Sequence, residues 1–307
     1  MRSACPHEQD GVYDLIAYHL GWIDEDGTPV EGGSGKMVRS HLCFLAASGY
    51  GDPGCAAKAA AAMELVHAFS LIHDDIEDGD TERRHRPTLW ALHGVPLALN
   101  AGDGLFALAL KTITLASESL PHPACIRAID LFVSGALKMI EGQHWDIDYE
   151  GRPRVSLDQY EAMAVRKTGA LLGTSLALGA IFSGADSLDE RLLFEAGQEM
   201  GLAFQAVDDA LAIWGDPELT GKAVGNDLQR GKKSLPVVLQ QALYPARRGG
   251  ESSFEAMAAD SNIRLEISHY ATEHAQRARD LIGKTAMSPE AREELSSVID
   301  FILQREI

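Results

Sequence analysis

Phe69-Ser-Leu-Ile-His-Asp74-Asp75-Ile-Glu77-Asp78-Gly79 is the stretch that decides the fold. A run of helix-forming residues ends here in four acids, and Gly79 marks the end of the helix. Residues four apart lie on one face of an α-helix, so Asp74 and Asp78 present two carboxylates on the same side. The C-terminal end of a helix is partly negative, so these acids cost stability unless cations offset them. Oxygen ligands select a hard cation, and Mg²⁺ is the best match.

Two arginines follow the acidic turn. An isolated pair of acids with this spacing is more typical of a solvated helix end than of a metal site. Arg83 and Arg84, however, come after one short turn, and paired guanidinium groups are the preferred partners of phosphate. The stretch therefore predicts a site where a metal ion and a phosphate group bind together.

The composition excludes several classes of protein. The 307 residues carry a formal net charge of −18, which argues against nucleic-acid binding and against an anionic-membrane surface protein. The four cysteines are scattered without zinc-site spacing. No basic, apolar leader begins the sequence, and apolar segments such as 170–182 are shorter than a membrane span, so no stable membrane insertion is expected. We expect a soluble, cytoplasmic protein.

Helical periodicity dominates the chain, whereas period-2 alternation is nearly absent. Asp52 and Pro53 resemble an N-cap and a first helical residue, and they precede the long apolar helix that ends in the acids. Ser156 with Gln159, and Ser187 with Glu190, are predicted capping boxes. Helices are expected over about 13–23, 97–117, 122–147, 157–183 and 188–214, and again from 235, 263 and 289. We predict an all-α fold: one domain over 1–307, a bundle of long helices around a central cavity, with 1–11 loosely structured.

A second acidic pair, Asp208 and Asp209, lies about 130 residues after the first, also at the end of an apolar helix. In a bundle the two pairs can face each other across the cavity. Taken singly, each lysine or arginine is typical of a solvated surface, and His67 of a packed histidine. Their joint spacing instead indicates diphosphate held by metal ions and cations, with a hydrocarbon chain in the apolar interior. The cations suited to phosphate are Lys36, Arg39, Arg83, Arg84, Lys167, Lys222, Lys232 and Lys233.

These motifs together resemble the trans-isoprenyl diphosphate synthase family, also called the polyprenyl synthetase family, over about residues 12 to 305. Five motifs match in order. They are Gly35-Lys36-x-x-Arg39, the first aspartate-rich motif with Arg83-Arg84, Lys167-Thr168-Gly169, Phe204-Gln205-x-x-Asp208-Asp209, and Gly221-Lys222 leading to Asn226-Asp227 and Gly231-Lys232-Lys233-Ser234-Leu235-Pro236.

The resemblance implies a role for each site residue. Isopentenyl diphosphate would be held by Lys36, Arg39, His67 and Arg84. The allylic diphosphate would be gripped by Arg83, Lys167, Lys222 and Lys232, and Mg²⁺ would be bound by Asp74, Asp78 and Asp208. Oxygens of Thr168 and Gln205 would steady the allylic carbocation, and residues 215–233 would form a lid that excludes water.

Two positions depart from the family pattern. Ser40 stands where proline is usual, which is expected to change local backbone rigidity. The second motif usually reads DDxxD, but its third acid is replaced by Ala212. Asp208 can suffice for the metal, with Asp209, Asp216 or Asp227 as supplementary acids, yet the loss leaves room for altered chemistry.

The predicted activity is the Mg²⁺-dependent condensation of isopentenyl diphosphate with dimethylallyl, geranyl or farnesyl diphosphate, giving geranylgeranyl diphosphate. Farnesyl diphosphate synthase, a terpene cyclase on the same scaffold and a regulatory subunit of a heteromeric synthase are the alternatives. A cyclase has no use for Lys36, Arg39 and Arg84, and a regulatory subunit would be expected to have lost its aspartates.

Two further expectations concern product length and assembly. Phe69, five residues before Asp74, is the candidate floor that stops the growing chain, and a core aromatic is the less favoured alternative. A single aromatic at this position, with the small Ser70 next to it, favours a twenty-carbon product by the resemblance. The resemblance alone also implies a homodimer.

Overall fold

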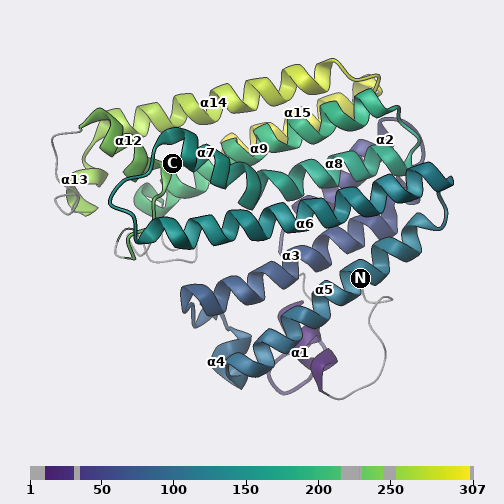
Figure 1. Ribbon diagram of the computed structural model, residues 1–307, viewed down its shortest axis with the longest axis horizontal. Coiled ribbons are helices and arrows are strands. Elements are labelled where there is room, and N and C mark those ends of the chain that lie inside the picture. Colours follow the sequence, from purple (N-terminus) through teal and green to yellow (C-terminus); the bar gives the residue numbers. More distant parts are fainter. Residues whose placement is uncertain (1–10, 31–34, 216–227, 229, 245–253, 305–307) are drawn as a thin grey trace. The chain divides into compact units, whose positions relative to one another are not determined.

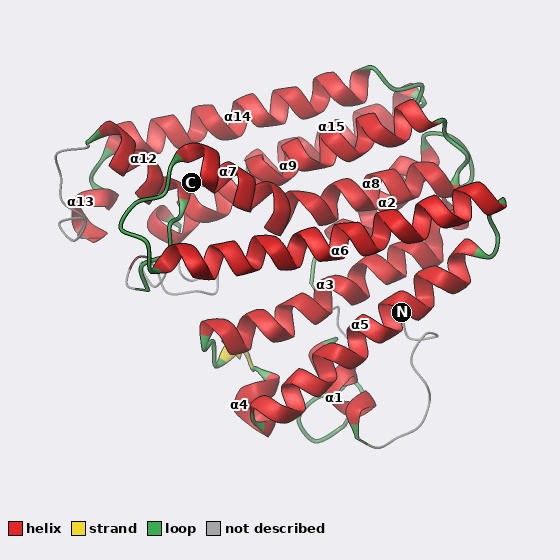
Figure 2. Ribbon diagram, in the orientation of Figure 1, coloured by secondary structure: helices red, strands yellow, loops and turns green. Residues whose placement is uncertain are grey.

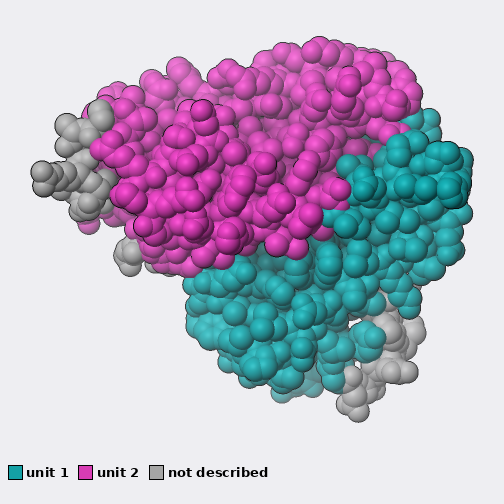
Figure 3. Space-filling model, viewed as in Figure 1, with its two compact units in different colours: residues 1–133, 178–185 teal, residues 134–177, 186–307 magenta. Residues whose placement is uncertain are grey.

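A computed structural model describes residues 11–30, 35–215, 228, 230–244 and 254–304 of the chain. Its contacts divide the chain into two compact units, coloured separately in Figure 3: residues 1–133 with 178–185, and residues 134–177 with 186–307. The expectation of one domain stays a prediction. The predicted loose segment, apart from Gly11, lies outside the described residues.

The first unit is built around two long helices, α3 and α5, which pack side by side (Figure 1). Helix α2 packs on α3, and α1 and α4 pack on α5. The elements are α1 (Val12–His19), α2 (Val38–Ser48), η2 (Pro53–Ala56), α3 (Ala57–Asp78), β1 (Glu82–Arg83), β2 (Arg86–Pro87), α4 (Leu89–His93), α5 (Val95–Ser117) and the start of α6 (His122–Glu150).

Helix α3 ends as its sequence predicts, but the predicted cap at Asp52 starts a 3-10 turn and the α-helix begins at Ala57. The Asp52 side chain accepts a hydrogen bond from Gly54 N–H, and the chain makes a 3-10 turn before the α-helix starts. Gly79, with φ of 69°, closes the helix in the left-handed conformation. By length and composition alone Pro53–Asp78 could cross a membrane, which corrects the expectation that the apolar segments are too short. Its most apolar window is 61% buried, as in the core helix of a folded domain.

The second unit is also helical. Helix α9 packs along α14 and contacts α15 and η3 (Figure 1). Its elements are the rest of α6, then α7 (Leu157–Ala164), η3 (Val165–Gly169), α8 (Ala170–Phe182, whose end belongs to the first unit), α9 (Ser187–Trp214), α12 (Leu235–Leu243), α13 (Phe254–Ala258), α14 (Ser261–Gly283) and α15 (Pro289–Leu303).

The all-α prediction is confirmed, and in the described residues the sheet is limited to the two-residue strands β1 and β2 (Figure 2). The capping box of Ser156 and Gln159 is also confirmed. The box at Ser187 is wrong, because Asp186, one residue earlier, accepts from two N–H groups of the first turn.

The predicted single helix over 157–183 is interrupted by a π-helical turn, η3, between α7 and α8. Gly142 of α6 lies against this turn, and a Cβ atom at Gly142 would overlap the backbone nitrogen of Lys167. The two backbones are therefore in direct contact. Single π-turns inside helices are frequent at functional sites, and this one carries Lys167 and Thr168.

Candidate active site

The acidic end of α3 is tied to the arginine pair that follows it. Arg83 Nε donates to Asp75 Oδ1 at 2.6 Å, and Arg83 Nη2 lies 3.4 Å from Asp74 Oδ2. Asp75 is buried, and this desolvation raises its pKa to about 6 although Arg83 opposes the shift. Asp75 thus holds Arg83 from within the fold, while Asp74 and Asp78 are only half-buried.

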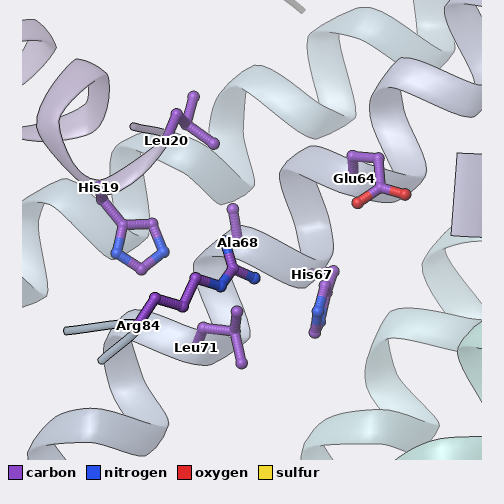
Figure 4. A pocket seen from close by; sticks show the side chains of 7 residues that line it. All are labelled: His19, Leu20, Glu64, His67, Ala68, Leu71 and Arg84. Atoms are coloured by element: carbon purple, nitrogen blue, oxygen red, sulfur yellow. The ribbon is translucent and has the colours of Figure 1, made fainter. Parts of the chain in front are cut away.

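Arg84 points into a small pocket of the first unit. Arg84 and His85 lie in the left-handed region of the backbone, with φ of 55° and 60°, in the turn between β1 and β2. Figure 4 shows the Arg84 guanidinium between His19 and His67, with Glu64 nearby on α3. The turn therefore directs Arg83 to the acids and Arg84 into the small pocket.

Gly35, in the loop before α2, packs against the guanidinium of Arg84. A Cβ atom at Gly35, whose φ is 86°, would lie 2.4 Å from Arg84 Nη2. Arg39 follows in the first turn of α2. Desolvation, then the positive charges of Arg39 and Arg84, hold the pKa of His67 well below its ordinary value. Three of the residues predicted for one diphosphate thus lie close together, namely Arg39, His67 and Arg84, and His67 is a neutral hydrogen-bonding group there.

Glu64 anchors the start of α2 next to this pocket. Its buried carboxylate accepts the backbone N–H of Ser40 at 2.8 Å. Ser40 is in the first turn of α2, where backbone N–H groups have no partner within the helix. A proline, usual in the family at this position, has no N–H to donate. Ser40 therefore gives the chain an anchor for α2 that proline would remove.

A cavity of about 150 Å³ continues from the pocket. His19 and Arg84 line both spaces. Burial and the neighbouring arginines lower the pKa of His19 to about 3. The lining of the larger cavity is Tyr18, His19, Gly21, Leu71, Asp75, Arg83, Arg84, Arg86, Pro87, Thr88 and Leu89. Its concentration of guanidinium groups favours an anionic ligand.

Phe69 is 7% exposed and packs on α5. Its ring centroid lies 5.1 Å from that of Phe106 and 4.8 Å from that of His73. Ser70 is half-buried, and its hydroxyl donates to His67 O. These contacts suit a cavity floor and a core aromatic equally, so the role of Phe69 stays a prediction.

In the second unit two predicted lysines share one carboxylate. Lys167 Nζ donates to Asp146 Oδ2 of α6, and Lys232 Nζ lies 4.0 Å from the same oxygen. Lys233 is different: its ammonium donates to the backbone oxygens of Glu150 and Gly231. Lys233 therefore also stabilises the fold, and its contact with phosphate stays a prediction.

Thr168 and Gln205 are hydrogen-bonded to each other, with Thr168 Oγ1 donating to Gln205 Oε1 at 2.6 Å. Asp208 is half-buried, whereas its neighbour Asp209 is 7% exposed. Adjacent residues of a helix point about 100° apart, so the two acids face different surroundings.

The sequence missed several members of these groups. His19, Glu64, Phe106, Asp146 and Tyr160 each contact a predicted residue or line its pocket, but none belongs to a pattern that periodicity or spacing reveals. Lys222, Asp216, Asp227 and most of the predicted lid lie outside the described residues. The first acidic motif belongs to one unit and the second to the other, so the expectation that they face each other stays a prediction.

The donor set suits Mg²⁺ bound together with a phosphate ligand. Within the described residues no three His, Cys, Asp or Glu side chains group as a metal site. Mg²⁺, however, is usually held by one or two carboxylates, with waters and substrate phosphates completing its shell. Asp74 and Asp78 on one side of α3, beside paired arginines, supply such a partial set.

Comparisons with known proteins show which proteins this chain is similar to. The family described as Polyprenyl synthetase matches residues 23–258. The chain is 46% identical over 239 residues to the geranylgeranyl diphosphate synthase of Mycobacterium tuberculosis, covering 78% of this chain and 67% of that relative. It is 38% identical over 311 residues to the (2E,6E)-farnesyl diphosphate synthase of the same species, covering 95% and 86%. The crystal structure of polyprenyl synthetase from Streptomyces coelicolor A3(2) superposes with a TM-score of 0.87 at 36% identity, covering 98% and 94% of the two chains.

The contact between Gly35 and Arg84 yields a prediction. Gly35→Ala would push the Arg84 guanidinium out of the pocket, and we expect the Kd for isopentenyl diphosphate, measured by calorimetry, to rise about 10-fold or more. Gly27→Ala is the matched control, because Gly27 has a similar φ of 79° but nothing within 4 Å of an added Cβ. Both variants should lose about 1–2 kcal/mol of stability from left-handed strain. Equal affinity in the two variants would contradict the prediction.

Proposed function

The chain belongs to the polyprenyl synthetase family, and from this premise we propose that it is a Mg²⁺-dependent prenyltransferase. It would condense isopentenyl diphosphate with an allylic diphosphate, namely dimethylallyl, geranyl or farnesyl diphosphate. The product would be a short-chain isoprenyl diphosphate, with geranylgeranyl diphosphate favoured. The enzyme would act in the cytoplasm.

One observation carries the proposal. In the first unit, Arg83 is bonded to the acids of α3, whereas Arg84 reaches on into the smaller pocket with His67, and both arginines line the larger cavity. We infer from this that adjacent arginines would serve two anions. A synthase that joins two diphosphates needs a site for each of them. A terpene cyclase uses one allylic diphosphate and has no need of the Arg84 pocket.

Each group of residues then has a task. Lys36, Arg39, His67 and Arg84 would hold isopentenyl diphosphate with its double bond toward the allylic partner. Arg83, Lys167 and Lys232, with Lys222 by resemblance, would hold the allylic diphosphate. Mg²⁺ bound to Asp74, Asp78 and Asp208 would neutralise charge on the leaving diphosphate.

The hydroxyl of Thr168 would face the developing allylic cation. Because its proton is donated to Gln205 Oε1, its lone pairs remain available for positive charge. As the allylic C–O bond breaks, the double bond of isopentenyl diphosphate forms the new C–C bond. The proton lost from the adduct would pass to the released diphosphate.

The proposal is tested by incubating the protein with Mg²⁺, isopentenyl diphosphate and each allylic diphosphate in turn, with identification of products by mass spectrometry. We expect elongated diphosphates and no turnover in excess chelator. A hydrocarbon formed from an allylic diphosphate alone would replace the synthase proposal with the cyclase. Full activity in excess chelator would show that the reaction does not depend on Mg²⁺.

The metal role of Asp74 gives a sharper prediction. Asp74→Asn should lower kcat about 100-fold or more while the fold survives, because the carboxylate would hold the ion that stabilises the leaving group. Glu77→Gln removes the same charge from an exposed position of the same turn and should change kcat only a few-fold. Equal losses would mean that the net charge of the turn matters rather than ligation.

The length of the product should depend on Phe69. Truncation to alanine would open space next to Phe106, so Phe69→Ala should shift products beyond twenty carbons, and Ser70→Phe should shorten them. Phe132→Ala is the control for loss of a core ring, since Phe132 is 1% exposed, and it should lower stability without altering the products. An unchanged product pattern in active Phe69→Ala would leave Phe69 as a core aromatic.

We propose a homodimer in which α6 supplies the contact. Exposed apolar side chains recur along this helix within about 80° of one another, at about 100° per residue. They are Ile126, Val133, Leu137, Ile140 and Ile147, which are 41% to 55% exposed. A stripe with this spacing is typical of a helix that packs against a partner.

Light scattering coupled to gel filtration tests this dimer. Leu137→Glu places a charge in the stripe and should convert a dimer at micromolar concentration into a monomer. Leu265→Glu is the matched control, because Leu265 of α14 is also 55% exposed. A monomeric parent protein, or two variants with the same mass, would contradict the proposed contact.

A further inference from the structure

The second aspartate of the second motif, Asp209, lies at the centre of a hydrogen-bond network. Tyr160 OH donates to Asp209 Oδ2 at 2.8 Å, and Leu235 N–H donates to the same oxygen at 2.7 Å. Gln205 Nε2 donates to Asp209 Oδ1 at 2.8 Å. With the carboxylate 7% exposed, these donors compensate a buried charge that would otherwise be costly.

These contacts distinguish Asp209 from Asp208. A carboxylate has about four lone-pair positions, and three donors already occupy the two Asp209 oxygens. Oδ2 accepts from both Tyr160 and Leu235, so a metal ion there would have to displace a donor that part of the fold depends on. Oδ1 is held by Gln205 Nε2, and a metal ion beside that bond would have to enter where the residue is 7% exposed. Asp208 is half-buried on a different face of α9.

The network reaches both groups that the proposed reaction would use. Because Gln205 Nε2 is held by Asp209, its Oε1 is directed to the Thr168 hydroxyl. The second link, to Leu235 N–H, fixes the first residue of α12. Lys232, beside Asp146, comes three residues earlier. One carboxylate thus connects the Thr168–Gln205 pair to the segment that carries a phosphate-binding lysine.

We propose that Asp209 is a positioning residue that orients Gln205, and through it Thr168, and anchors the start of α12, and that it does not bind the metal. The inference rests on the proposed prenyltransferase function. It assigns the second acid of the motif a task separate from that of Asp208. It also separates Asp209 from the supplementary metal ligands considered to compensate for Ala212.

Asparagine removes the proposed function of Asp209 at constant size. Its side chain has one acceptor oxygen and an NH₂ group, so it cannot accept from Gln205 and Leu235 on opposite oxygens as the carboxylate does. Asp208→Asn makes the same change at the proposed metal ligand. Asp189→Asn is the control for the loss of a structural carboxylate, since buried Asp189 accepts Ala286 N–H at 2.8 Å elsewhere in the same unit.

Metal binding is measured without turnover. The shift in Tm on adding Mg²⁺ with inorganic diphosphate should require at least 10-fold more Mg²⁺ in Asp208→Asn. It should need the same Mg²⁺ concentration within twofold in Asp209→Asn and Asp189→Asn. A requirement in Asp209→Asn as large as in Asp208→Asn would overturn the proposal, whether or not the protein elongates prenyl chains.

Turnover then tests positioning. Asp209→Asn should lower kcat about 10-fold or more and divert part of the allylic substrate to the alcohol formed by water capture. Asp189→Asn should keep the product distribution of the parent.

Tyr160→Phe keeps the carboxylate and removes one donor, so it should divert less substrate to the alcohol than Asp209→Asn does. It replaces Asp209→Asn as the test if that variant does not fold. If Asp209→Asn and Tyr160→Phe both gave the products of the parent, Asp209 would have only a structural role and the proposal would be overturned. Absence of elongation activity in the parent protein would contradict the proposed function, and the Mg²⁺ measurement would still test the role of Asp209.

Discussion

The constraint on which the site depends is that a helix N-terminus leaves backbone N–H groups without partners, and that a buried carboxylate can receive one of them. Each unit gives an example among its described residues. In the first, Glu64 of α3 accepts the N–H of Ser40 in α2. In the second, Asp209 of α9 accepts the N–H of Leu235 in α12. A hydrogen bond to a charged group contributes about 1.5–3 kcal/mol. In both cases the anchored helix begins just beside a predicted phosphate-binding segment, so stability and the position of the cations are set by the same bond.

Close backbone approach is the second requirement, and glycine supplies it in both units. Gly35 lets the loop before α2 lie directly on the Arg84 guanidinium, and Gly142 lets α6 touch the π-helical turn that carries Lys167. A larger residue would displace Arg84 in the first case and the turn itself in the second. The first contact ends on a flexible side chain, whereas the second ends on backbone. Substitution at Gly35 is therefore expected to weaken binding, whereas substitution at Gly142 is expected to destabilise the fold.

Local signals explain what the sequence could predict. The acids at the end of α3, the cap at Ser156 and the helical periodicity depend on neighbours within a few residues, and the structure has them where they are expected. The partners Glu64, Asp146 and Asp209 lie 24, 21 and 26 residues from the groups they bind, so tertiary packing selects them. Two predictions were wrong, the first because of a neighbouring residue and the second at a tertiary contact. The cap at Ser187 was displaced by the adjacent Asp186, and the helix over 157–183 was divided where α6 presses on it.

The net charge of −18 makes the whole chain unfavourable for a diphosphate, so affinity must come from local cations. These cations are not free in solution: Arg83 pairs with Asp75 and Asp74, and Lys167 pairs with Asp146. Pairing keeps long side chains in place, so less rotamer entropy is lost when a ligand arrives.

Pairing also permits an exchange of partners under the proposed function. Arg83 would pass from Asp74 to a phosphate oxygen while Asp74 takes the metal ion, so the number of opposite-charge contacts does not fall. Asp75, buried and bonded to Arg83 Nε, would hold the guanidinium throughout. The acids that make the chain negative thus prepare the cations that bind the anion.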